Sequence, residues 1–231
     1  MNKKNVLVLA GHLDDSILAI GGIIRKFTSA GHNVSVVSFG NNDEAFSRIK
    51  DRDTCVEKFY SQAVAAHKAL GVDDFLCHNI SDFSVQENRE TYRHCIHAIR
   101  RVKPDIIFGH YWREYFQHHA MAKLACDSWY QAGWDCSADL GRPWQARALY
   151  HFEVIQPLPD PTHLVDISDS FGFKIKALSK FNSSPGFMDA ISEKTEARAR
   201  FYGSQIGVKY AEALKESYFI PQKIADPSKE L

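Results

Sequence analysis

The stretch NVLVLAGHLDDS, residues 5–16, joins an apolar run to a histidine and two adjacent aspartates. The run at residues 5–10 is short and apolar throughout, which is typical of a buried strand. Such a strand ordinarily ends in a turn residue or a helix cap. This one ends in His12, Asp14 and Asp15, whose side chains are costly to bury. The end of the first strand is therefore the first candidate for a functional site.

Short apolar runs alternate with amphipathic stretches along the first part of the chain. Further strands are predicted at residues 33–39, 74–78 and 105–109, and helices at 16–30, 52–70, 89–102 and 117–132. Strands that alternate with helices of this length indicate right-handed βαβ units and a parallel sheet with helices on both faces. We therefore predict an α/β fold with a mostly parallel sheet.

The sequence changes character after about residue 133. This later part is predicted to hold one more strand and two helices, at residues 148–156, 166–182 and 187–216. No internal repeat or low-complexity segment divides the chain. We predict a single domain over residues 1–231, with a core at about 1–135 and a C-terminal helical and strand extension at about 136–220.

The first predicted helix contains the pair Gly21 and Gly22. A glycine inside a helix costs about 1 kcal/mol relative to alanine. Two in succession indicate that something must approach the helix backbone closely at this point. We expect that close contact to be with the sheet.

Composition narrows the classes of partner. The chain has 28 basic and 28 acidic residues and a formal net charge of zero, so we predict no binding to nucleic acid or to an anionic membrane. The first apolar run is too short for a signal peptide, and no run approaches the ~20 residues of a membrane helix. The five cysteines lack CxxC spacing, which indicates reduced thiols. We predict a cytoplasmic protein with a small-molecule partner, and the sequence leaves open whether it forms a homo-oligomer.

Histidine and aspartate residues gather at the carboxyl ends of two predicted strands. They are His12, Asp14 and Asp15 after the first strand, and His110, His118 and His119 at or after the strand at 105–109. Ligands of open α/β sheets bind outside the carboxyl ends of the strands. One or two imidazoles with a carboxylate leave a coordination position open for water, as in catalytic zinc sites. The sequence therefore predicts a catalytic metal site at this edge.

Adjacent aspartates allow a division of roles. His12-x-x-Asp15 supplies two ligands, and Asp14 between them is left to act as general base while metal-bound water attacks a carbonyl. The structural alternative is that Asp14 and Asp15 favour the first turn of a helix through its macrodipole. For the histidine pair at 118–119 the alternative is a solvated helix surface. The joint occurrence of both features at strand ends favours the metal site.

At these residues the chain resembles the PIG-L/LmbE-like family of zinc-dependent N-deacetylases. The family motif A-H-P-D-D-E and the paired glycine after it correspond to residues 11–16 and 21–22. KPDIIFGH at 103–110 and YAEA at 210–213 extend the resemblance over nearly the whole chain. It implies a Rossmann-like fold, a Zn²⁺ or other divalent cofactor, and removal of an acetyl group from an N-acetylated sugar or sugar conjugate. By position it implies His12 and Asp15 as metal ligands and Asp14 as base.

The second family motif, H-P-D-H, is where this chain departs. Counted from the strand, it aligns with FQHH at 116–119, which makes His119 the third ligand, whereas alignment on the following helix selects His118. Under the first alignment Phe116 stands where the family has a histidine that polarises the substrate oxygen or protonates the leaving amine. We expect His110, or the histidine of the pair that does not bind metal, to take that catalytic role.

Further departures indicate an altered substrate pocket. Ser16 replaces the glutamate of the first motif. The eroded second motif keeps an alternative open, in which the protein is a non-catalytic or regulatory member that binds a sugar nucleotide. Metal content and deacetylase activity discriminate between the two functions.

Five other residues have expected roles. We expect Asp82, Trp112, Arg113 and Glu114 to contact substrate, the last three from an aromatic loop that offers ring faces to a sugar. The alternatives are a turn-forming role for Asp82 and simple packing of the loop. The resemblance implies that Glu212 supports the site without touching the reacting atoms. We expect it on a late helix.

Overall fold

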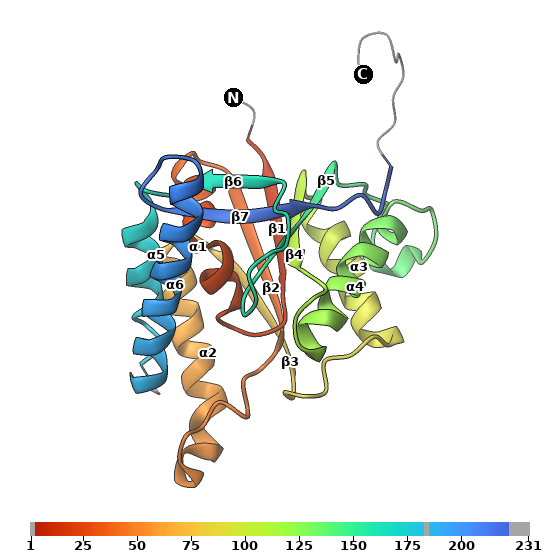
Figure 1. Ribbon diagram of the computed structural model, residues 1–231. Coiled ribbons are helices and arrows are strands. Elements are labelled where there is room, and N and C mark those ends of the chain that lie inside the picture. Colours follow the sequence, from red (N-terminus) through yellow and green to blue (C-terminus); the bar gives the residue numbers. More distant parts are fainter. Residues whose placement is uncertain (1–2, 183–184, 222–231) are drawn as a thin grey trace.

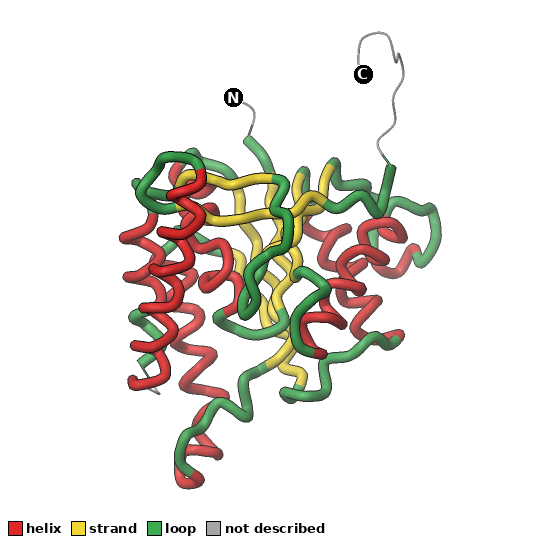
Figure 2. Tube along the Cα trace, viewed as in Figure 1, coloured by secondary structure: helices red, strands yellow, loops and turns green. Residues whose placement is uncertain are grey.

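A mostly parallel sheet runs through the middle of the protein, whose computed structural model describes residues 3–182 and 185–221 (Figures 1 and 2). The strands are β1 (Asn5–Ala10), β2 (Asn33–Gly40), β3 (Asp74–Ile80), β4 (Ile106–His110), β5 (Ala148–Phe152), β6 (His163–Asp166) and β7 (Ala211–Glu216). Their order in the sheet is β3-β2-β1-β4-β5-β7-β6. The first five strands are parallel, and β7 is antiparallel to β5 and β6.

Helices cover both faces of this sheet. They are α1 (Asp15–Ser29), α2 (Arg52–Ala69), α3 (Arg89–Val102), α4 (Phe116–Ala132), α5 (Phe171–Leu178) and α6 (Pro185–Gln205), with short 3-10 helices at Ile49–Asp51 and Ala138–Leu140. Figure 1 shows α3 and α4 on one side of the sheet and α1, α2, α5 and α6 on the other. Within the described residues, none of the helices has the length and apolar character needed to cross a membrane. The predicted α/β fold is confirmed.

Strand β1 explains why the first apolar run has no polar positions. Val6 and Val8 point into the core shared with α1, whereas Leu7 and Leu9 point into the core shared with α3 and α4. Side chains alternate between the two faces of a strand, and here both faces are covered by helices. A central parallel strand of this kind is apolar throughout, and its polar residues follow only where it leaves the sheet.

The prediction of a helix over 187–216 is wrong after Gln205. Helix α6 ends at Gln205, Gly207 takes a φ of +72°, and the chain continues as β7. Ala211 and Ala213 then pack against Tyr202 on one face of β7, while Leu214 joins the main core on the other. This segment consists largely of helix-forming residues, so its strand conformation comes from pairing with β5 and β6 rather than from propensity. The helix expected over 166–182 is also shorter, because Asp166 ends β6.

The paired glycines of α1 do make a close contact, but not with the sheet. A Cβ on Gly22 would lie 2.8 Å from atoms of Ile167, and one on Gly21 would lie 3.1 Å from Cγ of Lys174. Both neighbours belong to the C-terminal extension, which folds back over α1. The helix is also broken here, since Ile20 has a non-helical φ of −128° and ψ of 27°.

A buried ion pair fills the break in α1. Glu212 accepts hydrogen bonds from the backbone N–H groups of Gly22 (2.9 Å) and Ile23 (2.8 Å). Lys174 donates to the Glu212 carboxylate at 2.6 Å and to the carbonyl of Ala19 at 3.2 Å. Glu212 therefore lies on a strand, not on the expected helix. It supports α1 at the point where the helix lacks its own hydrogen bonds.

Ser16, which stands where the family motif has a glutamate, is bonded to a buried histidine. Its hydroxyl lies 2.8 Å from Nε2 of His67, and Nδ1 of His67 lies 2.8 Å from the carbonyl of Ala63. Because a carbonyl can only accept, Nδ1 carries the hydrogen and Nε2 accepts from Ser16. Burial lowers the pKa of His67 to about 4, although the bond to Ala63 opposes the shift. The folded protein thus holds His67 neutral.

This arrangement predicts a loss of stability in acid. An unfolded histidine binds a proton below about pH 6.5, whereas folded His67 does so only near its lowered pKa of about 4. The free energy of unfolding should therefore fall by about 3 kcal/mol through His67 alone as the pH drops across that interval. Urea unfolding at several pH values measures it. His67→Gln should lose this part of the pH dependence and His97→Gln, at an exposed position of α3, should keep it; equal slopes in both variants would contradict the assignment.

Candidate functional site

Two turns at the carboxyl edge of the sheet bring the candidate ligands together. His12 lies in the turn after β1, Asp15 is the first residue of α1, and His118 lies in the first turn of α4, which follows β4. A Cβ on Gly11 would approach Asp15 Oδ2 and His118 Cδ2 to 3.2 Å. A glycine before His12 therefore gives these side chains the room to converge.

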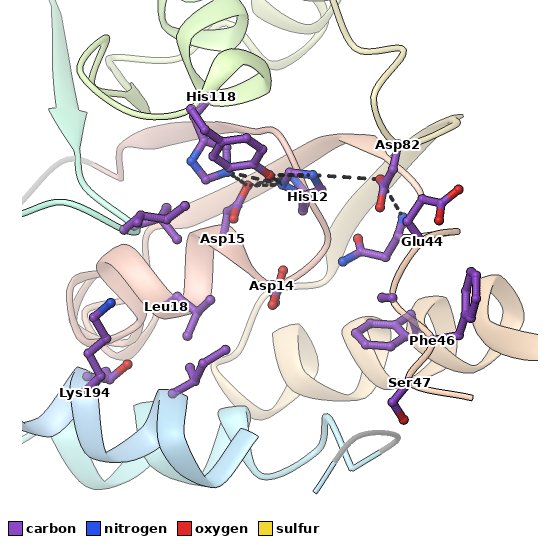
Figure 3. A pocket seen from close by; sticks show the side chains of 18 of the residues that line it. His12, Asp14, Asp15, Leu18, Glu44, Phe46, Ser47, Asp82, His118 and Lys194 are labelled. Carbon is purple, nitrogen blue, oxygen red and sulfur yellow. Dashed lines mark hydrogen bonds and ion pairs between the residues drawn. The ribbon is translucent and has the colours of Figure 1, made fainter. Parts of the chain in front are cut away.

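His12, Asp15 and His118 form a nearly equilateral triangle of potential ligand atoms (Figure 3). Nδ1 of His12, Oδ2 of Asp15 and Nε2 of His118 are each 3.2 Å from the other two. Donor atoms of a tetrahedral zinc, each about 2.05 Å from the metal, lie about 3.3 Å apart. The three donor atoms are therefore spaced as the ligands of a tetrahedral zinc are, and all three residues line the cavity.

The charges around the triangle favour a cation. Burial alone would lower the pKa of His118, but Asp15 and Glu114 raise it to about 9. Burial opposes protonation of His12 as well, yet Asp15 also raises the pKa of this histidine. Burial would raise the pKa of Asp15, but the nearby histidines hold it well below its usual value. The carboxylates of the site therefore stabilise positive charge next to the imidazoles, and a metal ion could supply that charge.

Glu114 orients His118 from behind. Its Oε2 is hydrogen-bonded to Nδ1 of His118, so Nε2 of that ring keeps its lone pair toward the triangle. Its Oε1 accepts from the backbone N–H groups of Val154 and Ile155, both at 2.6 Å. Burial would raise the pKa of Glu114, but His110 and His118 hold it far below its usual value. We expected Glu114 to contact substrate. Instead, both of its carboxylate oxygens are bonded to His118 and to the backbone of residues 154–155, and Glu114 does not line the cavity.

Asp14 lies beside the triangle without belonging to it. Its backbone carbonyl accepts the first hydrogen bonds of α1, but its side chain makes no capping hydrogen bond to the helix. Burial and the neighbouring Asp15 raise the pKa of Asp14 to about 6. The carboxylate faces a cavity of about 580 Å³ that the three ligand residues also line. Asp14 therefore makes no capping hydrogen bond, and its position and raised pKa suit a general base.

The residues around this site match a known family. Residues 7–130, more than half of the chain, match the PIG-L family, described as GlcNAc-PI de-N-acetylase. The chain belongs to the PIG-L family. His12, Asp14, Asp15 and His118 all lie within the matched residues.

Full-length relatives extend the likeness beyond the PIG-L segment. Diacetylchitobiose deacetylase of Thermococcus kodakarensis is 26% identical over 234 residues, covering 94% of this chain and 84% of that protein. The structure of N,N'-diacetylchitobiose deacetylase from Pyrococcus horikoshii superposes with a TM-score of 0.87 at 20% identity, covering all of this chain and 90% of that one. A 4-carboxy-2-hydroxymuconate hydratase from Pseudomonas putida gives 0.82 at 20%, with 96% and 99% covered. At these identities the structures show the fold alone, and the fold does not establish the reaction.

The structure distinguishes the two neighbouring histidines of the second PIG-L motif by their positions. His118 completes the triangle, whereas His119 is exposed and its Nδ1 lies 2.9 Å from the backbone carbonyl of Trp112. His110 is fully buried, stacks on His118 with ring centroids 4.1 Å apart, and accepts from the N–H of Gly11 at 2.9 Å. It does not line the cavity, so the expected contact of His110 with substrate is absent from this arrangement.

The residues expected on the substrate divide into two groups. Asp82 lines the cavity, and its Oδ1 lies 3.9 Å from Nε2 of His12 and accepts from the N–H of Asn42 at 3.1 Å. Trp112 and Arg113 are exposed and do not line the cavity. The expected sugar platform at Trp112 therefore does not face this cavity.

Sequence reasoning missed Tyr115 as an individual site residue. Its hydroxyl lies 3.1 Å and 3.0 Å from the two ring nitrogens of His12, and it lines the cavity. Burial and the surrounding carboxylates raise the pKa of Tyr115, so the hydroxyl keeps its proton. Its position directly before the FQHH motif is the signal that could have found it. The bond of Glu114 to His118 was also missed, and the signal for it is the spacing of four residues between them.

Proposed function

We propose that this protein is a metal-dependent amidohydrolase that removes an acetyl group from an N-acetylated sugar or sugar conjugate. The observation that carries the proposal is the triangle of His12, Asp15 and His118 with the separate carboxylate of Asp14 beside it. Membership of the PIG-L family and the deacetylase relative support the reaction class.

His12, Asp15 and His118 would hold a divalent metal, and their donor set of two imidazoles and one carboxylate suits zinc. When bound, such a metal supplies a Lewis acid for a carbonyl oxygen and lowers the pKa of water. Glu114 and His110 support the ligands from behind: Glu114 orients His118, and His110 packs between Gly11 and His118. We assign both as positioning residues.

The side chains that face the cavity would carry the proton transfers. Asp14 takes a proton from the attacking water while the new C–O bond forms at the amide carbon. The same carboxyl group then returns the proton to the leaving nitrogen as the C–N bond breaks, which gives acetate and an amine. The Tyr115 hydroxyl donates to the developing oxyanion, the role that the absent motif histidine leaves open. Asp82 accepts a hydrogen bond from a sugar hydroxyl.

Acetate release tests the proposal directly. The purified protein, loaded with zinc, is incubated with N-acetylglucosamine, its glycosides and nucleotide sugars, and free acetate is measured. We expect release that stops with a chelator and returns when the metal is restored. A protein that binds no metal and releases no acetate would instead favour the non-catalytic, sugar-nucleotide-binding alternative.

The choice between the two neighbouring histidines gives a separate prediction. His118→Ala should lower zinc affinity more than ~100-fold, because even changes behind a ligand cost 10- to 100-fold. His119→Ala should retain one zinc per chain, since its ring bonds to the backbone of Trp112 instead. Zinc content after dialysis and competition with a chromogenic chelator measure both variants. The reverse pattern would make His119 the ligand.

A further inference from the structure

The two imidazoles of the candidate metal centre differ in the groups that support them. A histidine that binds a metal through one ring nitrogen ordinarily donates the hydrogen on its other nitrogen to a carboxylate, a carbonyl or water. For His118 that nitrogen is Nδ1, which is bonded to the Glu114 carboxylate. For His12 it is Nε2, and the Asp82 carboxylate lies 3.9 Å from it, beyond hydrogen-bond distance (Figure 3). Asp82 therefore does not support His12 as Glu114 supports His118.

The side chain of Gln117 lies behind His12. It is fully buried in the first turn of α4 and does not line the cavity. Its Oε1 accepts from the backbone N–H of Phe83 at 2.7 Å, and its Nε2 lies 3.0 Å from Nε2 of His12. The loop before Phe83 is itself fixed, because the N–H of Asp82 donates to the Asp43 carboxylate at 2.7 Å. Gln117 therefore contacts a candidate ligand from the side that substrate does not reach.

The amide of Gln117 decides where His12 carries its hydrogen. An amide has one accepting oxygen and one donating NH₂ group, and the N–H of Phe83 can only donate to the oxygen. The NH₂ group therefore faces His12, and Nε2 of that ring accepts. The one hydrogen of the neutral ring is then on Nδ1, where Asp15 Oδ2 accepts it at 3.2 Å. Nδ1 is the atom of His12 that belongs to the triangle, so this hydrogen occupies the lone pair that a metal needs.

The conflict does not disappear when the side chain turns over. The lone pair of Nδ1 is free only when the ring hydrogen is on Nε2, where it meets the NH₂ group of Gln117. Reversing the amide would bring the NH₂ group against the N–H of Phe83 instead. The Tyr115 hydroxyl, 3.0 Å from Nε2, can accept the ring hydrogen, but the NH₂ group stays beside it. Gln117 is fully buried, so solvent does not supply a second acceptor.

We propose that Gln117 is a positioning residue that opposes metal binding at His12, so that the centre holds a divalent metal more weakly than its three ligands allow. The inference rests on the proposed function, because it concerns the same metal centre. The groups behind a ligand ordinarily change metal affinity by about 10- to 100-fold. Metal occupancy, and with it activity, then responds to the supply of metal.

Gln117→Glu tests the proposal. A carboxylate has two accepting oxygens, one for the N–H of Phe83 and one for a hydrogen on Nε2 of His12. We expect the zinc affinity of the whole protein to rise at least about tenfold. Competition with a chromogenic chelator measures it, and circular dichroism checks that the variant folds.

Asn42→Asp separates the hydrogen bond from the added charge. Asn42 lines the cavity, and its Oδ1 accepts from the backbone N–H of Leu13 at 3.0 Å. Aspartate keeps that bond and tolerates the left-handed backbone at this position, where φ is +58°. The variant thus adds one negative charge to the site without an acceptor behind His12. We expect its zinc affinity to rise less than about threefold; equal rises in the two variants would overturn the role of Gln117.

The position of the hydrogen on His12 is a readout that does not involve zinc. Nitrogen NMR of the zinc-free protein with labelled histidine distinguishes a ring protonated on Nδ1 from one protonated on Nε2. At a pH where the ring is neutral, we expect the hydrogen of His12 on Nδ1. A hydrogen on Nε2 in the unsubstituted protein would overturn the inference.

A second variant keeps the proposal testable if Gln117→Glu does not fold. Gln117→Met removes the NH₂ group, so zinc affinity should stay the same or rise. A tenfold fall would mean that Gln117 supports His12, and the inference would be wrong.

The outcomes separate this inference from the function on which it rests. Zinc affinity that is unchanged or lower in folded Gln117→Glu would overturn the inference and leave the deacetylase function standing. No zinc binding by the unsubstituted protein or by any variant would overturn both.

Discussion

Replacing Asp14 with asparagine should lower kcat by roughly 10²- to 10⁴-fold, the usual contribution of a general base. Asparagine is nearly isosteric with aspartate but cannot take a proton from water at neutral pH. Asp14 is outside the triangle of His12, Asp15 and His118, so the variant should still bind one zinc per chain. Steady-state acetate release gives kcat and KM, and elemental analysis gives the zinc content.

The control for this substitution is a second carboxylate in the same cavity. Glu44 lines the cavity but is exposed, and Glu44→Gln should change kcat less than about threefold. Full kcat in Asp14→Asn would remove the base assignment. Loss of zinc together with activity would show instead that Asp14 is needed to form the metal centre.

Replacing Lys174 with methionine should lower the free energy of unfolding by about 3–5 kcal/mol. The substitution leaves the Glu212 carboxylate buried without its cation and removes the donor to the carbonyl of Ala19. Breaking a buried pair from one side is costly because the remaining charge stays desolvated. Urea or thermal unfolding of the two proteins, monitored by circular dichroism, measures the difference.

A lysine on the same helix serves as the comparison. Lys176 is exposed on α5, and Lys176→Met should change the unfolding free energy by less than about 0.5 kcal/mol. Equal stability of the two variants would mean that the Lys174–Glu212 pair does not hold the break in α1. The pair also links the C-terminal extension to the helix that begins at Asp15, so the extension is expected to affect the site through stability.

The parts of the site that were predictable depend on contacts between near neighbours in the chain. His12 and Asp15 are three residues apart, so one turn after β1 is enough to bring their donor atoms to 3.2 Å. The alternation of strands and helices is likewise visible in short windows, because burial on one or both faces leaves a local pattern. These features predicted both the α/β fold and the first two candidate ligands.

Neighbouring histidines are a different case. Successive residues of a helix point about 100° apart, so His118 and His119 cannot both face the site. Which one does depends on how α4 packs against β1 and β4, and no local pattern in FQHH reports that rotation. The structure also places the Tyr115 hydroxyl beside His12 and leaves Trp112 and Arg113 exposed in the loop before α4.

A buried strand followed by His12, Asp14 and Asp15 was predictable from the sequence, because strand burial and a three-residue spacing are local properties. The third candidate ligand, the strand at Ala211–Glu216 and the partners of Glu212 depend on the tertiary structure. Each of these depends on segments that lie between 38 and 190 residues apart in the chain. Residues 211–216 favour a helix by propensity, and they form a strand because the neighbouring strands bond to their backbone and α1 lacks the hydrogen bonds that Glu212 supplies.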